Sequence, residues 1–493
     1  MYRRMKGTPH LSSYFSLNHI FFDGFLDKLS SLPLAQSRSI DSHTPTESEC
    51  CVFYGKIYCQ FEPCVEVAEA MLVKNGLVKV LGSAQQVDDY INLSGLKPRF
   101  QYLDERHVIC PGFVEPNMHL VISAILQQWS NLGPFGFDCT WHKLMPNYSF
   151  CYIARALLYL DKALSQPKDW LLGYGLCSGL LGHNINDNRK EVYDLINQLN
   201  VKRPVAVLDA NKAMAYINEP AQELIYEYLT CSGTSPFTSK KIFKEFVDNQ
   251  KGLYNEQLLW LVGALPDLQL QTQLDNIYEY LDKIVNLALR QGVTHIGIKD
   301  THPFARRILA EYQPANINLV EPRDNWIYAL NSLDCINSDL NAINDHTDRS
   351  VVINIGDVGY CGYEWVQSYH GQSLLLPCQQ LVAQGYNVCL QSGFPMQPLG
   401  PMRAAEQACT RIMEYAPGCY TRHERSLLPE QCLTKEQSLN AITSASATHL
   451  GCEGGKLQVG GQANFVHLSD DPLATSHCFR DLAIINCYSN VTS

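Results

Sequence analysis

Short, β-rich runs of apolar residues mark both ends of the chain. Residues 52–59 form one such run, and residues 70–82 read as two strands joined at Asn75-Gly76, a dipeptide typical of tight hairpins. The same pattern returns near the C-terminus, in residues 463–468 and 482–487. We therefore expect the two ends of the chain to meet in one small sheet domain.

A different pattern fills the middle of the chain from residue 111 onward. Short apolar runs such as residues 204–208 and 293–298 alternate with long stretches of helical periodicity such as residues 273–290. Repeated helix-then-strand units favour a parallel α/β architecture.

Composition excludes several classes of function. The chain has 493 residues, 46% of them hydrophobic, and a formal net charge of −11, from 38 Lys and Arg against 49 Asp and Glu. An acidic balance without a compensating basic run argues against a nucleic-acid partner. No apolar run is long enough to span a membrane, and the basic N-terminus lacks the apolar stretch of a signal peptide.

The cysteines point to a reducing compartment. The chain has 19 of them, an odd number scattered along its whole length and without a C-x-x-C pair. This distribution supports neither a disulfide framework nor a zinc knuckle, and free cysteines of this kind behave as small buried hydrophobes. We expect a soluble cytoplasmic protein.

Several segments carry a family resemblance. Residues 111–120 resemble the Pro-Gly-Phe-x-Asp-x-His-x-His segment on the first barrel strand of the amidohydrolase superfamily, and residues 455–466 are similar to its closing Gly-Lys-x-Ala-Asp-Phe-Val segment. Residues 170–175, 214–218 and 252–256 resemble the long-chain branch that includes the N-substituted formamide deformylases.

The resemblance implies an α/β fold with two parts. Such relatives fold as a (β/α)8 TIM-like barrel plus a small β-sandwich built from both termini. We expect residues 111–449 to form the barrel, and residues 51–110 together with 450–493 to form the sandwich. Residues 1–50 are rich in Ser, His and Thr without sustained periodicity, so we expect a mobile or loosely docked extension.

The resemblance also implies metal-assisted hydrolysis of C–N bonds. In such relatives two His residues, spaced by one residue on the first strand, point to one face and bind divalent ions together with later His residues and a final Asp. The metal lowers the pKa of its bound water toward ~7 and polarises the scissile carbonyl.

This sequence departs from that ligand set at four positions. Asn117 replaces the first His of the pair, so that only His119 remains. Ala213 and Ile353 stand where the resemblance places two further His residues, and Gly393 replaces the catalytic Asp in the segment Gln-Ser-Gly-Phe-Pro. Gly and Ala cannot bind a metal through a side chain, and a neutral amide is a poor zinc ligand.

Two hypotheses follow. The first is a catalytically impaired pseudoenzyme that binds a small-molecule ligand or a partner and needs no cofactor. The alternative is an active metal-dependent hydrolase of non-peptide C–N bonds, with zinc in an atypical site. A homo-oligomer would need an exposed apolar face, which a sequence does not show.

Six residues are candidates for a residual site. His295 and Lys299 share one face of the strand at residues 293–298, and a Lys at a strand end can be carbamylated to bridge metals or can simply form a surface ion pair. The candidates are Glu256 and Lys299 for catalysis, Tyr216 and Asn218 for substrate contacts, and His119 and His295 for a metal. Structural roles stay open: Glu256 as a cap or ion-pair partner, and His119 as a hydrogen-bonded core residue.

Overall fold

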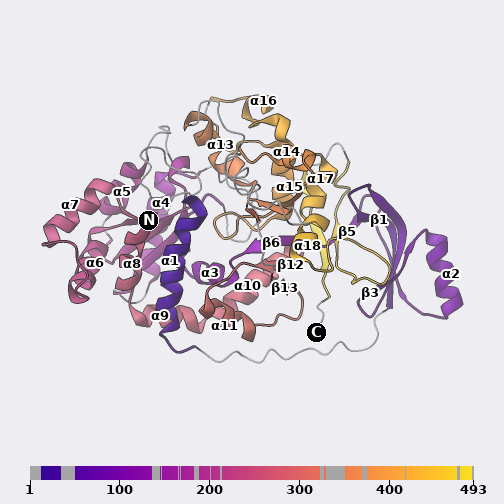
Figure 1. Ribbon diagram of the computed structural model, residues 1–493, viewed down its shortest axis with the longest axis horizontal. Helices are drawn as coiled ribbons and strands as arrows, with labels where there is room; N and C mark the ends of the chain where they lie inside the picture. Colours follow the sequence, from indigo (N-terminus) through magenta and orange to yellow (C-terminus); the bar gives the residue numbers. More distant parts are fainter. Residues whose placement is uncertain are drawn as a thin grey trace.

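The computed structural model describes most of the chain in three connected parts (Figure 1). A β-sheet with α2 lies at one end, parallel strands and their helices form the middle, and a lobe with α4 to α8 forms the other end. The described residues are 13–34 (side chains from residue 21), 50–135, 145, 147–164, 166, 168–181, 188–199, 201–210, 214–321, 327–328 (backbone), 350–368, 375–416, 418–474 and 478–490.

Strands from both ends of the chain form one sheet, the terminal sheet, in the order β18-β17-β5-β1-β2-β3, with β4 paired to β1. The N-terminal strands are β1 (Cys50–Gln60), β2 (Glu66–Lys74), β3 (Leu77–Gly82), β4 (Arg99–Tyr102) and β5 (Val108–Pro111), and the C-terminal strands are β17 (Phe465–Leu468) and β18 (Ile484–Tyr488). β17 pairs antiparallel with both β5 and β18. The two ends of the chain therefore meet as expected.

The hairpin in this sheet also follows the sequence pattern. Asn75 and Gly76 join β2 to β3 with φ angles of 55° and 71°, the left-handed backbone of a tight turn. The helix α2 (Ala84–Ser94) covers one face of the sheet through Val87 and Ile91. The sandwich is not confirmed, because the described strands of the two ends belong to a single sheet.

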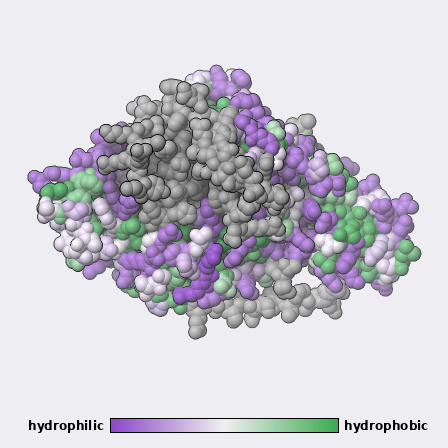
Figure 2. All heavy atoms as spheres, viewed as in Figure 1, coloured by the Kyte–Doolittle hydropathy of each residue, from purple (hydrophilic) through white to green (hydrophobic). Residues whose placement is uncertain are grey.

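Apolar side chains gather on the surface of this end of the molecule (Figure 2). β4 presents Phe100 and Tyr102, which are 51% and 74% exposed, and both rings stack on Tyr54.

Two parallel sheets form the middle of the molecule. The first has the order β13-β12-β6, from β6 (Phe113–Met118), β12 (Val293–Ile298) and β13 (Asn318–Val320). The second has the order β14-β15-β16, from β14 (Ile327–Tyr328), β15 (Ser350–Ile353) and β16 (Asn387–Leu390). The parallel α/β architecture is confirmed, but the described strands do not close a barrel. β15 pairs directly with β16, so the second sheet has no strand between them.

Helices pack around these sheets. They are α3 (Leu120–Leu126), α9 (Asp267–Asp275), α10 (Ile277–Arg290), α11 (Pro303–Glu311), α13 (Asp357–Ser368), α14 (Cys378–Ala383), α15 (Pro401–Thr410), α16 (Arg422–Arg425), α17 (Lys435–Ala441) and α18 (Ser444–Leu450), with the short 3-10 turns η3 (Pro429–Gln431) and η4 (Phe479–Asp481). The helical periodicity of residues 273–290 is thus divided between α9 and α10, which meet at Asn276.

The lobe contains a five-stranded sheet in the order β11-β10-β9-β8-β7. Its strands are β7 (Ser130–Asn131), β8 (Leu171–Leu176), β9 (Val205–Asp209), β10 (Met214–Ile217) and β11 (Leu253–Tyr254). Its helices are α4 (Phe150–Ala163), α5 (Arg189–Gln198), α6 (Glu219–Cys231), α7 (Lys240–Gln250) and α8 (Leu258–Ala264), with the turns η1 (Ser178–Leu180) and η2 (Asn255–Gln257). None of the described helices combines the length and hydropathy that a membrane span needs.

The helix α1 (Ser13–Ser30) packs beside α8, between the lobe and the middle of the molecule (Figure 1). Phe21 and Phe25 are each 1% exposed, and their rings pack edge-on against Trp129. The Lys28 ammonium donates to carbonyl groups at the end of α8, 2.9 Å from the oxygen of Gly263. The expectation of a loosely docked extension is therefore wrong for the described part of α1. Its apolar face packs against the rest of the protein and buries Phe21 and Phe25. Residues 1–12 and 35–49 lie outside the described part of the chain.

Candidate functional site

A cavity of about 1100 Å³, counting the space at its mouth, opens at the carboxyl ends of four parallel strands. His119 follows β6, Asp300 follows β12, Asn354 follows β15 and Gly393 follows β16, and all four residues line it. The carboxyl ends of parallel strands are where ligand sites of α/β folds lie. The helix α1 adds Phe22, Asp23 and Leu26 to the wall, so it covers part of the mouth.

The walls are mostly apolar and carry a few acidic groups. Tyr360, Trp365 and Phe394 contribute aromatic rings, and Ile122 and Leu126 contribute aliphatic surface. The acidic side chains among the described lining residues are Asp23, Asp300 and Asp357. An apolar cavity with few converging polar groups is the usual form of a small-molecule site.

Asp300 caps the helix that begins beside it. Its Oδ2 accepts hydrogen bonds from the backbone N–H groups of Leu120 (2.7 Å) and Val121 (3.3 Å), at the start of α3. Burial raises the pKa of Asp300 to about 7, against the lowering effect of these N–H groups. The carboxyl therefore changes charge near neutral pH.

Asp357 begins α13 and holds two amide side chains. Its Oδ1 accepts hydrogen bonds from Nε2 of Gln397 (2.6 Å) and Nδ2 of Asn354 (3.1 Å). Burial raises the pKa of Asp357 to about 7, although the nearby Arg403 acts in the opposite direction. A second buried carboxyl that titrates near neutrality therefore lies on the cavity wall.

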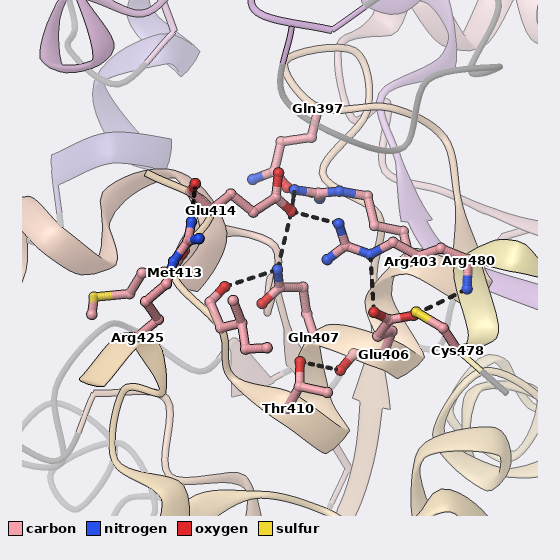
Figure 3. Close-up of polar contacts among 11 residues, drawn as sticks. Gln397, Arg403, Glu406, Gln407, Thr410, Met413, Glu414, Arg425, Cys478 and Arg480 are labelled. Atoms are coloured by element: carbon pink, nitrogen blue, oxygen red, sulfur yellow. Dashed lines mark hydrogen bonds and ion pairs between the residues drawn. The ribbon is translucent and has the colours of Figure 1, made fainter. Parts of the chain in front are cut away.

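Gln397 connects Asp357 to a buried ionic cluster behind the wall (Figure 3). Nη1 of Arg403 donates to Oε1 of Gln397 (3.1 Å), and Nη2 of Arg403 donates to Oε1 of Glu414 (3.0 Å). Arg480 donates to the same Glu414 oxygen at 2.9 Å. The cluster fixes the Gln397 amide, which in turn fixes the Asp357 carboxyl.

The charges inside this cluster balance without Asp357. Arg403 and Arg480 contribute two positive charges, and Glu414 contributes one negative charge. Glu406 supplies the second, with a carboxyl oxygen 3.7 Å from Nε of Arg480 (Figure 3). When Asp357 is ionised, its negative charge therefore has no matching positive charge left over in this cluster.

Two neutral amides meet at the ends of β6 and β16, near residues that line the cavity. Nδ2 of Asn117, at the end of β6, donates to Oε1 of Gln391, which follows β16, and the residues are 7% and 5% exposed. Glu115 lies beside them, 1% exposed, and accepts from the backbone N–H of Ser392 at 3.2 Å. Burial raises the pKa of Glu115 to about 8, so this carboxyl is mostly protonated at neutral pH.

The other replaced ligand positions lie in different surroundings. Ile353 is buried at the end of β15. Gly393 lines the cavity with a φ angle of +77°, a backbone conformation that favours glycine. Ala213 lies outside the described residues.

The two candidate metal residues are separated. His119 lines the cavity, whereas His295 lies on β12 with its ring against Gly454, where an added Cβ would be 2.7 Å from Cε1 of the imidazole. Nδ1 of His295 is 2.9 Å from Oγ1 of Thr294, and burial lowers the pKa of His295 to about 4. Lys299 does not line the cavity either, and burial lowers its pKa to about 8.

The remaining three candidates lie in the lobe, and none of them lines the cavity. Tyr216 is buried on β10, and its hydroxyl donates to Oδ2 of Asp209 at 3.3 Å. Asn218 caps α6, and its Oδ1 accepts from the backbone N–H of Val205 at 2.9 Å. Glu256 is exposed in η2.

The described residues do not fit a zinc site. No group of three or more His, Cys, Asp or Glu side chains among them could hold a metal ion. At the strand ends where the resemblance places ligands, the Asn117 and Gln391 amides are bonded to each other. Of the two candidate metal residues, His119 lines the cavity and His295 does not.

One segment of the chain matches a known protein family. Residues 350–478 match the amidohydrolase family. The matched amidohydrolase segment contains β15, β16 and the lining residues Asn354, Asp357 and Gly393. None of the curated proteins matches the chain.

Solved structures of metal-dependent hydrolases share the fold. An uncharacterized metal-dependent hydrolase from Pyrococcus horikoshii OT3 is 13% identical, with a TM-score of 0.54 over 88% of this chain and 99% of that one. A second, from Pyrococcus furiosus, is 12% identical, with a TM-score of 0.50 over 86% of this chain and 100% of that one. At these identities the likeness concerns the fold alone.

Proposed function

We propose that this chain is an amidohydrolase-superfamily protein that binds a small organic ligand in the cavity and has lost metal-dependent hydrolysis. By resemblance it derives from the long-chain branch of the N-substituted formamide deformylases. The observation that carries the proposal is the hydrogen bond between the side chains of Asn117 and Gln391.

This amide pair occupies the strand ends where a hydrolytic site needs metal ligands. A His ligand offers a ring nitrogen lone pair to the metal, whereas Asn117 offers a neutral amide oxygen, which is a poor zinc ligand, and its Nδ2 is bonded to Gln391. Glu115 lies beside the pair. It is mostly protonated at neutral pH and so supplies little negative charge to balance a dication. These groups therefore favour an uncharged pair of hydrogen-bonded amides over a bound metal ion.

The cavity at the ends of the same strands supports ligand binding. It combines aromatic walls such as Tyr360 and Trp365 with the carboxyls of Asp300 and Asp357. α1 covers part of its mouth through Phe22 and Leu26, which would shield a bound ligand from water.

A calorimetric titration with 4-phenylbutan-1-ol, a neutral apolar probe, tests ligand binding. We expect saturable binding with one site per chain. Ala210→Phe adds a ring at the cavity wall and should weaken binding at least tenfold. Ala163→Phe, at an exposed position of α4, is the matched control and should leave the affinity unchanged.

Thr301→Phe, at the exposed rim, is a second filling variant if Ala210→Phe folds poorly. Equal binding by the wild type and both filling variants would contradict the assignment of the cavity. Hydrolysis of an N-substituted formamide in proportion to added zinc would instead support the alternative of an active hydrolase with an atypical site.

A further inference from the structure

We propose that the ligand of this cavity is an organic cation, a protonated amine on an apolar body. The inference rests on the proposed function, because it names the chemical class of ligand for the same cavity. Its basis is the combination of acidic and aromatic groups on the wall: the described lining residues include three Asp side chains and neither Lys nor Arg.

The two buried carboxyls have no cation of their own among the partners described above. Asp300 is held by backbone N–H groups at the start of α3, which carry only partial positive charge. Asp357 is held by the neutral amides of Asn354 and Gln397. Arg403 acts to lower the pKa of Asp357 by its charge. It donates its hydrogen bonds to Gln397 and Glu414, however, and its charge is paired with Glu414.

The other ionisable groups around the cavity do not reverse this balance. Asp23, on the exposed side of α1, adds a third carboxyl at the mouth. His302, on the rim, lies with Nε2 3.1 Å from Oδ1 of Asp27, so a protonated imidazole there would be neutralised by α1 itself. His119 lines the cavity, and Lys299 lies next to Asp300 in sequence but outside the lining.

The aromatic walls complement a cation with an apolar body. Phe22, Tyr360, Trp365 and Phe394 line the same cavity. The faces of aromatic rings attract ammonium groups, by about 2 kcal/mol or more when water is excluded. The rings and aliphatic side chains also offer the surface on which an apolar body is buried.

A buried acceptor without a donor supports a ligand that carries N–H groups. Oδ1 of Asn354 has no hydrogen-bond partner within the described part of the chain, and the residue is 9% exposed. It lies over Gly393, where an added Cβ would be 2.8 Å from this oxygen. Asn354 and Asp357 both line the cavity, and Nδ2 of Asn354 donates to the Asp357 carboxyl.

Three probes of equal length and different charge test the inference: 4-phenylbutylammonium, 4-phenylbutan-1-ol and 4-phenylbutanoate. Calorimetric titrations are made at pH 8, because burial raises the pKa of Asp300 and Asp357 to about 7 and both are then mostly ionised. We expect the ammonium probe to bind at least tenfold more tightly than the alcohol, and the carboxylate at least tenfold more weakly.

Asp357→Asn should weaken binding of the ammonium probe at least tenfold and change binding of the alcohol less than twofold. Asp89→Asn, at an exposed position of α2, is the matched control and should change neither affinity. Asp23→Asn, at the exposed mouth, should weaken binding of the ammonium probe alone and remains informative if Asp357→Asn fails to fold.

The outcomes separate the two proposals. Equal affinities for the three probes, or tighter binding of the carboxylate, would overturn the cation inference and leave ligand binding in place. Failure of all three probes to bind the wild type would overturn both.

Discussion

The side chain of Asn117 donates a hydrogen bond to the side chain of Gln391, and this contact joins the end of β6 to the end of β16. Both residues are buried, close in sequence to His119 and Gly393, which line the cavity. By resemblance, Asn117 stands where the amidohydrolases have the first His of their metal-binding pair. The contact ties up the Nδ2 of Asn117, while its Oδ1 has no hydrogen-bond partner in the described part of the chain.

Breaking this pair from one side should destabilise the fold. Asn117→Leu leaves the Gln391 amide buried without its partner, which costs about 1–3 kcal/mol. We expect that loss in the free energy of unfolding measured by urea denaturation. The double variant Asn117→Leu/Gln391→Leu should recover much of the loss, because no polar group is then left unpaired. Additive losses in the double variant would contradict a coupled pair.

Restoring the missing carboxylate should not restore a metal site. In Gly393→Asp the side chain meets a φ angle of +77° and Oδ1 of Asn354, 2.8 Å from the added Cβ. Gly385→Asp is the matched control, since its φ is +81° with nothing within 4 Å of an added Cβ.

The control should lose about 1–2 kcal/mol from backbone strain, and Gly393→Asp should lose more. Thermal unfolding with and without zinc measures both effects, and we expect zinc to stabilise neither variant. Zinc-dependent stabilisation of Gly393→Asp would indicate a working ligand set.

Stability should fall as the pH rises through neutrality. Burial raises the pKa of Glu115 from 4.5 to about 8, so the folded state keeps a proton that the unfolded chain releases. This contribution is complete below pH 4.5 and is lost as the pH rises through 8. From Glu115 alone we expect a loss on the order of 2 kcal/mol between about pH 6 and pH 9.

Glu115→Gln should remove that part of the pH dependence, and Glu227→Gln, at an exposed position of α6, should not. Asp300 and Asp357 act in the same direction, with pKa values raised to about 7. His295, with its pKa lowered to about 4, costs stability only as the pH falls below 6.5. An identical pH profile for wild type and Glu115→Gln would contradict a protonated Glu115.

The C-terminal strands should be required for solubility. Deletion of residues 451–493 removes β17 and leaves the edge of β5 unpaired, together with the Phe53 ring that packs on Phe465. We expect insoluble protein, whereas deletion of residues 491–493 should leave solubility unchanged. A soluble truncation that unfolds cooperatively would contradict the pairing of the two ends.

Short sequence motifs explain the features that were predicted correctly, such as the hairpin turn. The turn at Asn75-Gly76 depends on two residues with positive φ, so the dipeptide itself specifies the hairpin. His119 belongs to a motif that directly follows a strand, and it does line the cavity. Alternation along the strand at residues 293–298 groups His295 with its neighbours on one face, but it does not say whether that face meets the cavity or α18.

Long-range packing accounts for what was missed. Phe21, Phe25 and Leu29 have the spacing of an apolar helix face, but the surface that buries them becomes visible only in the fold. Asp300 and Asp357 each follow a short apolar strand and precede a helix, which is a usable signal for residues at a strand end. Their burial, and hence their raised pKa, depends on elements far away in the sequence.

Metal content tests the central claim most directly. Elemental analysis of the purified, dialysed protein should find less than about 0.2 equivalents of zinc, iron or manganese per chain, because the described residues offer no group of the three ligands that a catalytic site needs. Near-stoichiometric metal would contradict the account, and the protein would then have to be treated as a working hydrolase.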